Sequence, residues 1–458
     1  MRDAISIVLL STYELGRQPF GLASPAAWLA QAGHRVTCLD LSRQELDEAA
    51  VASADVVAFY VPMHTATRLA IEMIAPVRRI NPRAHLCFYG LYAPVNEAYL
   101  RKLGVQTVLG GEFEEGLVKL TQRLAAGGHQ PAPTQTEPVI SLARQHFVTP
   151  LRAGLPELKG YAHLVMPSGE HRVTGYTEAS RGCKHLCRHC PVVPVYNGVF
   201  RIVDRDVVLD DIRRQVAAGA QHITFGDPDF FNGIGHAVAL VESFHREFPG
   251  VSYDVTIKVE HLLRHAHHLR TLRETGCLFV TTAVESVDDA VLDRLDKGHT
   301  RADFLAVVEL MREAGLPLHP TFVPFTPWTT PESYCDLLDL LAAQRIAEAV
   351  APIQLAIRLL IPAGSRLLEL GEVRGMVEPF DEAGLVYPWK HADQRVDEMC
   401  DEVQSIVARA DKFKKPRSET FARIREAAFR AAGRAMEDAA PVLVARAAIP
   451  YLNEPWYC

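Results

Sequence analysis

Three cysteines within eight residues form the group in this chain with the clearest capacity for chemistry. Cys183, Cys187 and Cys190 follow the spacing Cys-x3-Cys-x2-Cys, beside Gly182, which permits a tight turn. Thiolates are soft ligands that suit iron–sulfur clusters or zinc. A four-iron cluster held by only three thiolates keeps one iron open, and an open iron can bind an amine and a carboxylate. The spacing therefore favours a [4Fe-4S] cluster with a vacant position.

Structural zinc is the alternative interpretation of the same loop. His185 or His189 would then serve as the fourth ligand. Structural zinc sites usually draw paired ligands from two separate loops, and no second Cys-x2-Cys pair occurs in the chain. The sequence thus favours the cluster over zinc, and a non-catalytic iron–sulfur or zinc protein remains the alternative from outside the enzymes.

Composition indicates a packed protein of more than one domain. The 458 residues are 48% hydrophobic and 22% charged, and a single domain usually has ~100–200 residues. The formal net charge of −7 leaves no basic excess for phosphates, so no nucleic-acid partner is expected. No apolar run reaches the ~18–20 residues of a membrane helix, and the apolar N-terminus is too short for a signal peptide. We expect a cytoplasmic protein without a membrane partner.

The remaining cysteines give no sign of a disulfide scaffold. Nine cysteines are an odd number, and the chain lacks a secretion signal. Five stand singly in apolar or mixed surroundings and are expected to be buried thiols: Cys38, Cys87, Cys277, Cys335 and Cys400.

Alternating hydrophobic strands and helices predict an α/β architecture. Residues 1–126 read as a parallel, doubly wound Rossmann-like domain with strands at 5–10, 35–39, 56–61, 85–89 and 105–109. Residues 127–172 read as a linker and connecting region that begins with Gly, Pro, Gln and Thr.

A second series of strand–helix units follows the connecting region. Six strands, at 175–180, 222–226, 252–257, 279–285, 318–325 and 353–360, predict a partial or full βα barrel over 173–370. Residues 371–458 read as mainly helical, with a long helical stretch over 393–436 and a tail that ends in cysteine. Barrel enzymes carry their chemistry on the loops after the strands, where the three cysteines stand.

On these motifs the chain resembles the radical S-adenosylmethionine (SAM) superfamily over roughly residues 174–370. The resemblance rests on the three-cysteine spacing after the first strand of a βα barrel. It implies that the open iron chelates the methionine part of SAM and that reductive cleavage of a C–S bond gives a carbon radical. It also implies an external electron donor such as a flavodoxin or ferredoxin. His189 stands where the family usually has an aromatic residue beside the adenine of SAM.

The same resemblance points to SAM-binding residues after successive strands. Phe225-Gly226-Asp227-Pro228-Asp229 occupies the place of the family's Gly-Gly-Glu-like segment, so Asp227, with Asp229, is expected to read the amino group of SAM. Glu285 and Ser286, followed by Lys297-Gly298-His299-Thr300, resemble the Glu-Ser…Lys-Gly-x-Thr segment of cobalamin-type members. They are expected at the ribose or carboxylate of SAM.

Three further charged residues are weaker predictions for the same site. Lys258 and Glu260 follow the third predicted strand, and Arg358 lies in the sixth. Each of them alone is more often part of a rim or a buried ion pair, and only their positions after strands favour a role in SAM binding.

The N-terminal domain resembles the cobalamin-binding domain that precedes many radical SAM barrels, including Gly110 and Gly111 ahead of its last helix. The cobalt-ligating Asp-x-His-x-x-Gly motif is absent, since neither His34 nor His64 has that context. Some relatives bind cobalamin without that histidine, so cobalamin stays open. The two glycines would look the same in a tight turn that begins a helix.

The last residue, Cys458, is predicted to act in catalysis by presenting the acceptor. The run Glu454-Pro455-Trp456-Tyr457-Cys458 resembles the tail of the CUAEP/CCAEP-tail radical SAM proteins, in which selenocysteine or a second cysteine follows. We expect selenocysteine to follow here, so that the native tail is longer. Adjacent thiol and selenol groups would suit a soft element such as trivalent arsenic.

Together these features predict a radical SAM transferase acting on a small molecule. Because the tail group includes an enzyme of arsinothricin biosynthesis, the specific prediction is transfer of the 3-amino-3-carboxypropyl group of SAM to arsenite, as in the biosynthesis of that arsenic-containing antibiotic. The alternatives are a cobalamin-dependent methyltransferase and a 5′-deoxyadenosyl-radical enzyme on a small metabolite.

Overall fold

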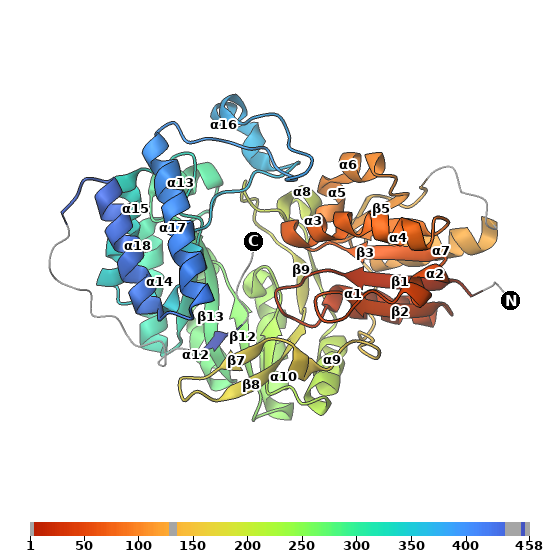
Figure 1. Ribbon diagram of the computed structural model, residues 1–458. Coiled ribbons are helices and arrows are strands. Elements are labelled where there is room, and N and C mark those ends of the chain that lie inside the picture. The colour runs from red at the N-terminus through yellow and green to blue at the C-terminus, as the bar shows by residue number, and fades with distance from the viewer. Residues whose placement is uncertain (1–3, 128–134, 436–449, 454–458) are drawn as a thin grey trace.

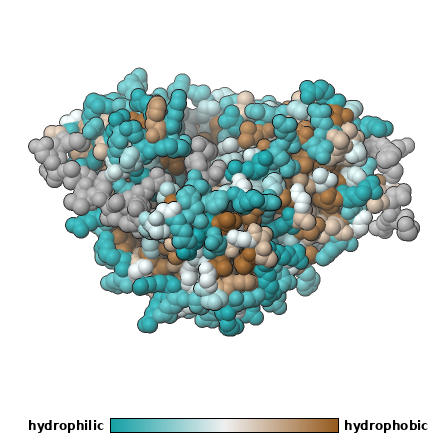
Figure 2. All heavy atoms as spheres, turned by 60° about the horizontal axis from the view of Figure 1, so that its bottom comes forward, coloured by the Kyte–Doolittle hydropathy of each residue, from teal (hydrophilic) through white to brown (hydrophobic). Residues whose placement is uncertain are grey.

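The computed structural model describes residues 4–127, 135–435 and 450–453 and consists of two α/β units, each built on its own sheet, and a helical C-terminal region (Figure 1). No helix among these residues is long and apolar enough to cross a membrane. Hydrophilic side chains cover much of the face in Figure 2, and the large exposed hydrophobic residues are scattered over separate elements.

The N-terminal sheet is parallel, with strand order β2-β1-β3-β4-β5-β6. Its strands are β1 (Ser6–Ser11), β2 (Arg35–Asp40), β3 (Val56–Tyr60), β4 (His85–Tyr89), β5 (Thr107–Gly111) and β6 (Ile140–Ser141). Nearly continuous apolar strands match a sheet covered on both faces. This confirms the predicted doubly wound domain, while β6 comes from the segment predicted as connecting.

Helices cover both faces of the N-terminal sheet. α1 (Phe20–Gln31) and α7 (Glu114–Gly127) pack on one face through Leu22, Leu29 and Leu117. α2 (Glu48–Ala52), α3 (His64–Glu72), α4 (Ile74–Ile80), α5 (Tyr92–Val95) and α6 (Glu97–Lys102) follow the strands on the other side.

The second sheet is a curled partial barrel with order β14-β13-β12-β11-β8-β7-β15. Its parallel strands are β8 (His171–Thr177), β11 (His222–Phe225), β12 (Ser252–Thr256), β13 (Cys277–Glu285) and β14 (Leu318–Phe322). The edge strands β7 (His163–Val165) and β15 (Tyr451–Leu452) pair antiparallel. The C-terminal segment therefore returns to the edge of the barrel.

Helices pack against the outside of this sheet. They are α9 (Arg205–Ala217), α10 (Ile234–Glu247), α11 (Val259–Arg264), α12 (Leu269–Glu274), α13 (Asp289–Leu295), α14 (Arg301–Ala314) and α15 (Pro331–Ala343). Short 3-10 turns include η1 (Leu158–Gly160), η2 (Phe230–Gly233), η3 (Ala266–His268) and η4 (Ala347–Ala349).

The predicted sixth barrel strand at 353–360 is wrong. The segment begins as the 3-10 turn η5 (Pro352–Leu355), and only an isolated bridge joins Arg358 to Phe325. Pro352 stands at the first position of that turn, where its fixed φ suits a helical start and its missing N–H would break a strand ladder. The barrel is consequently partial.

The C-terminal helical region is confirmed, but its long stretch is two helices. After η6 (Arg366–Glu369) and α16 (Gly371–Met376), α17 (Gln394–Lys412) and α18 (Arg417–Ala431) pack against each other. Pro416 stands immediately before α18, where it cannot continue the preceding helix. Val403, Ile424 and Phe429 join the barrel core.

Candidate functional site

The cysteine loop begins at a strand end that only glycine fits. β9 (Ser180–Gly182) pairs with β10 (Phe200–Ile202), and the short helix α8 (Val193–Tyr196) closes the loop. Gly182 has φ of 74°, and a Cβ there would lie 2.5 Å from the Val199 carbonyl oxygen. The chain therefore turns sharply just before Cys183.

The three predicted ligands lie on this loop. Cys183 and Cys187 are buried, at 9% and 6% exposed. Burial raises the pKa of the Cys190 thiol to about 12, and the neighbouring Cys187 and Cys183 sulfurs raise it further. All three are free thiols. The three thiols that the spacing singles out therefore lie on one loop, close enough to influence one another electrostatically.

Hydrogen bonds from other barrel elements hold the loop in place. The Arg188 backbone N–H donates to the Leu295 carbonyl at 2.9 Å, and its guanidinium donates to the Asp293 and Arg294 carbonyls. The Asn232 side-chain oxygen accepts from the Lys184 backbone N–H at 3.2 Å. Nothing in the sequence pattern marked Asn232, which reaches the loop only through η2.

Two buried lysines surround the thiols with positive charge. Lys258, after β12, places its Nζ 3.7 Å from the Cys187 Sγ. Lys297 is 3% exposed and lies 3.2 Å from the Glu285 carboxylate. Nearby ammonium groups favour the thiolate, which is the form that binds metal, over the neutral thiol. The predicted Lys258 therefore contacts a predicted ligand directly.

Glu285 is the carboxylate that joins Lys297 to the cysteine loop. His189 Nε2 lies 3.2 Å from the Glu285 Oε1, which also accepts from Lys297. Burial alone would raise the pKa of Glu285, but Lys297 and His189 hold it at about 2. Glu285 also has φ of 70° at an irregularity in β13, a strained conformation of the kind found at functional sites.

A second carboxylate, Asp229, gathers histidines behind the loop. It is fully buried, caps η2 and lies 2.7 Å from His261 Nδ1 and 3.5 Å from His185 Nε2. Burial alone would raise its pKa, but these two histidines lower it to about 2. The predicted Glu260 lies 3.5 Å from His185 Nδ1 and also pairs with Arg264. Asp229 and Glu260 therefore position His185.

Asp227 is buried directly beneath the cysteine strand. Its two oxygens accept from the Ala179 backbone N–H at 3.0 Å and the Ser180 hydroxyl at 2.5 Å. Burial raises the pKa of Asp227 to about 7 despite these bonds. Asp227 supports the start of the loop, and its carboxylate would have to exchange these partners to bind an amine.

The other predicted residues lie in different surroundings. Ser286 uses its hydroxyl to accept from the Asp288 backbone N–H at 3.0 Å. Arg358 pairs with Asp397 of α17 at 2.7 Å and stacks over the Trp389 ring. Arg358 therefore joins the barrel to the C-terminal helices. Cys458 lies outside the described residues.

His299 is a residue of this site that the sequence prediction missed. It is 7% exposed, and neither ring nitrogen has a hydrogen-bond partner among the described residues. Burial lowers its pKa to about 4, and the neighbouring Lys297 and Lys258 lower it further. A buried imidazole with two unpaired nitrogens needs a partner, which a ligand between the two lysines would supply. Its place within the Lys-Gly-x-Thr segment was the available signal.

Zinc has some support in the geometry. Cys183, His185 and Asp229 place ligand atoms within 4.8 Å of one another, and His261 and His265 stand at His-x3-His spacing beside them. That arrangement would use one of the three clustered thiols. A cluster uses all three, so the donor set as a whole favours iron and sulfide.

A family model described as Radical SAM superfamily matches residues 177–341. Among curated proteins, the chain is 26% identical over 196 residues to a tRNA-2-methylthio-N(6)-dimethylallyladenosine synthase of Geobacter sulfurreducens, covering 39% of this chain and 42% of that protein. It is 24% identical over 177 residues to the ribosomal protein uS12 methylthiotransferase RimO of Parabacteroides distasonis, covering 36% and 40%. The chain thus spans less than half the length of these relatives.

Solved structures share the fold over more of the chain. The cobalamin-dependent SAM radical enzyme OxsB in its apo form matches with a TM-score of 0.68 and 13% identity, covering 94% of this chain and 72% of that one. The radical SAM methyltransferase TsrM from Kitasatospora setae, with tryptophan and a SAM analogue bound, matches with a TM-score of 0.59 and 18% identity, covering 74% and 71%. At these identities the likeness extends to fold alone.

The family match implies a [4Fe-4S] cluster and SAM, and the residues fit both. Three thiols on one loop supply the ligand set of a cluster with one open iron, and the Lys258 Nζ lies 3.7 Å from one of them, Cys187. His299 and His189 each keep an unpaired buried ring nitrogen nearby. The site therefore has sulfur donors for a cluster and unpaired polar groups for a bound molecule.

The structural neighbours suggest cobalamin, but the space beside Gly110 and Gly111, the glycines of the predicted cobalamin site, is already filled. A Cβ on Gly110 would lie 2.1 Å from Pro94 Cγ, and one on Gly111 would lie 2.2 Å from the Ser141 carbonyl oxygen. Both glycines are required by the chain's own packing. The adjacent pocket between the two sheets has about 190 Å³, below the ~300–1,000 Å³ of pockets for drug-sized ligands. These residues do not fit a corrin.

Proposed function

We propose that this radical SAM enzyme cleaves SAM reductively at a [4Fe-4S] cluster held by Cys183, Cys187 and Cys190, and transfers a SAM-derived group to a small acceptor. The observation that carries the proposal is the presence of three thiols on one loop, two of them buried, with the Lys258 Nζ 3.7 Å from the Cys187 sulfur. When bound, the cluster supplies an open iron and passes one electron from an external donor into a C–S bond of SAM.

The protein's own side chains would hold and orient SAM. Lys297 and Lys258 are buried cations that could pair with the carboxylate of SAM. Burying that carboxylate without a cationic partner would be costly. His299 offers two unpaired ring nitrogens beside them, and His189 offers one for the ribose or adenine. Glu285 fixes Lys297 and His189 together, so it positions both rather than contacting SAM with a free carboxylate.

The names of the similar proteins and the C-terminal sequence run favour different transferred groups. The curated relatives are named as a 2-methylthio-adenosine synthase and a methylthiotransferase, and the structural neighbour TsrM as a methyltransferase, which favours transfer of a methylthio or one-carbon group. Transfer of a 3-amino-3-carboxypropyl group to arsenite rests on the C-terminal run that ends in Cys458. None of the similar proteins named above acts on arsenic by its name, so transfer to arsenite remains a prediction from the C-terminal run alone.

A cobalamin-dependent methyltransferase is the second candidate. The names of TsrM and OxsB favour it, whereas the filled space around Gly110 and Gly111 counts against it. Corrinoid retained by protein purified anaerobically from cobalamin-supplied cells would favour this candidate.

Product analysis tests the proposal. Anaerobically reconstituted protein, reduced with dithionite, is expected to convert SAM to 5′-deoxyadenosine or methylthioadenosine, whereas Cys183→Ser should yield neither. An iron-loaded wild-type protein that releases neither product would contradict it. With arsenite added, 5′-deoxyadenosine without methylthioadenosine would overturn the arsenic form.

A further inference from the structure

The carboxyl edges of the two sheets meet at a small pocket beside the cysteine loop, whose Gly182, Val192 and Tyr196 form part of its wall. Its cavity has about 190 Å³, and residues after strands of both sheets line it: Glu14, Tyr60 and Phe113 from the N-terminal sheet, and Tyr176, Glu178 and Arg181 from the barrel. Ligands of open α/β sheets bind in the crevice beyond the carboxyl ends of the strands. The pocket lies where two such edges face each other.

Four carboxylates, those of Glu14, Glu112, Glu114 and Glu178, share two guanidinium groups at this junction, Arg17 and Arg181. Arg181 is 6% exposed, forms an ion pair with Glu114 at 2.7 Å and donates a hydrogen bond to it at 2.9 Å. It also contacts Glu178 at 2.8 Å and Glu112 at 3.4 Å. One buried guanidinium is therefore shared by three carboxylates, and it has no further N–H directed at Glu14 among the described residues.

Glu14 supplies an unsatisfied acceptor in the pocket wall. It is 6% exposed, and its Oε2 has no hydrogen-bond partner in the part of the chain that the structure describes. A buried carboxylate oxygen without a donor is costly. Burial raises the pKa of Glu14 well above its ordinary range and the nearby Glu178 raises it further, although Arg17 and Arg152 oppose the shift. A cationic donor bound in the pocket would supply the missing hydrogen bond and would compensate the buried negative charge.

Aromatic rings make up much of the remaining wall. Phe20, Tyr60, Phe113, Tyr176 and Tyr196 line it. These rings already hold cations: the Arg17 guanidinium lies 4.7 Å from the Tyr176 ring centroid, and Arg181 lies 5.6 and 5.5 Å from those of Phe20 and Phe113. Ring faces attract organic cations, most strongly where water is excluded.

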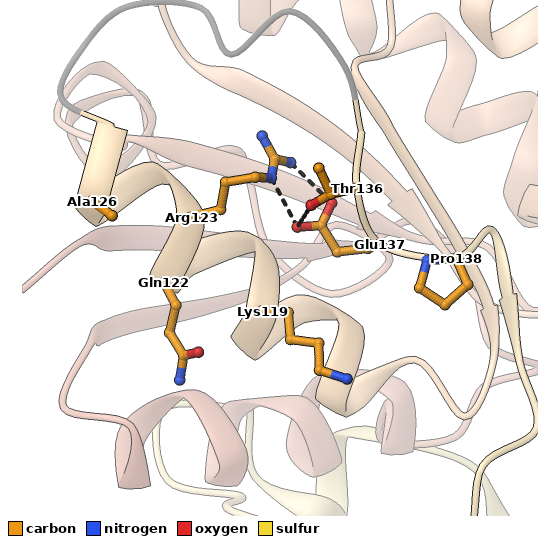
Figure 3. Close-up of a pocket in the computed structure, with 7 residues that line it drawn as sticks. All are labelled: Lys119, Gln122, Arg123, Ala126, Thr136, Glu137 and Pro138. Atoms are coloured by element: carbon orange, nitrogen blue, oxygen red, sulfur yellow. Dashed lines mark hydrogen bonds and ion pairs between the residues drawn. The ribbon is translucent and has the colours of Figure 1, made fainter.

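We infer that this pocket binds a small organic cation, with a protonated amine donating to Glu14 Oε2 among the aromatic rings. The role of this cation as the acceptor substrate rests on the proposed function, whereas its binding does not. A second hollow of about 440 Å³ between α7 and residues 136–138 is different, because its carboxylate, Glu137, is already paired with Arg123 (Figure 3).

Calorimetric titration of the full-length protein without reductant tests the inference. Phenethylamine is the probe, and 2-phenylethanol and phenylacetate are its neutral and anionic analogues. Because hydrogen bonds to charged groups contribute about 1.5–3 kcal/mol, the amine should bind about 10-fold or more tightly than either analogue. Glu14→Gln should reduce amine affinity by a similar factor. Glu115→Gln, on exposed α7 surface paired with Lys119, is the matched control and should leave it unchanged.

Equal binding of the amine and the alcohol by wild-type protein would overturn the inference, even if Glu14→Gln does not fold. Displacement of phenethylamine by hydroxocobalamin would also overturn it, because the pocket would then be part of a corrinoid site. SAM cleavage is measured separately. Amine binding by a protein that cannot cleave SAM would refute the proposed function and support the cation site. SAM cleavage by a protein that does not bind the amine would refute the cation site and support the proposed function.

Discussion

The cysteine loop and the junction between the sheets are both buried and charged, but they are charged in opposite ways. Around the loop, Lys258 and Lys297 face thiols and one carboxylate. At the junction, Arg181 is surrounded by Glu112, Glu114 and Glu178. Since charges are buried only when compensated, the first region suits an anionic cluster and the carboxylate of SAM, and the second suits a cation. One barrel face thus offers neighbouring sites of opposite preference.

The largest expected effect comes from removing a sulfur ligand. Cys183→Ser, Cys187→Ser and Cys190→Ser should each abolish SAM cleavage and most cluster absorbance, because no other thiol lies on the loop. Iron and sulfide content after reconstitution is the measurement. Cys38→Ser, in the N-terminal sheet, is the control and should retain both. Full iron loading in all three variants would disprove the assignment.

Removing the guanidinium at the junction should destabilise the fold. Arg181→Met leaves three buried carboxylates without their cation, and the loss of one partner of a buried pair costs about 3–5 kcal/mol. Chemical denaturation followed by circular dichroism measures it. Arg270→Met, which breaks an exposed pair with Glu274, should leave the midpoint unchanged. Equal effects of the two variants would show that the junction is not a stabilising network.

The acidic excess at the junction predicts a pH dependence. Burial raises the pKa of Glu112 from 4.5 to about 7, so the folded protein holds this proton more tightly than the unfolded chain. The contribution of Glu112 to stability is therefore greatest below about pH 4.5 and falls as the pH rises toward about 7, by up to about 3 kcal/mol. Denaturation midpoints at pH 5 and pH 7.5 measure it, and Glu112→Gln should reduce the difference. If the difference between the two midpoints is as large in Glu112→Gln as in wild type, other groups cause the pH dependence.

The smallest expected effect concerns positioning behind the loop. Asp229→Asn removes the charge that holds His185 and His261. Losing such a supporting contact typically lowers metal affinity 10- to 100-fold. Iron release to a chelator measures it, with Asp204→Asn, at an exposed helix start, as the control. Slower iron release from Asp229→Asn than from wild type would contradict this role.

Local patterns predicted most of the scaffold and the ligands, whereas partners across the fold needed the structure. Apolar runs located β1 to β5, and the cysteine spacing located the loop. The false strand at 353–360 arose because an apolar run cannot by itself reveal the turn that Pro352 begins. Asn232 and the sharing of Arg181 by three carboxylates depend on residues far apart in sequence, which no spacing encodes.

The central claim, a cluster with an iron open to SAM, is tested most directly by electron paramagnetic resonance of the reduced, reconstituted protein. Addition of SAM should change the g-values of the wild-type cluster signal, because SAM would become a ligand of the iron that lacks a cysteine. Spectra that are identical with and without saturating SAM would contradict the account and favour a non-catalytic iron–sulfur protein.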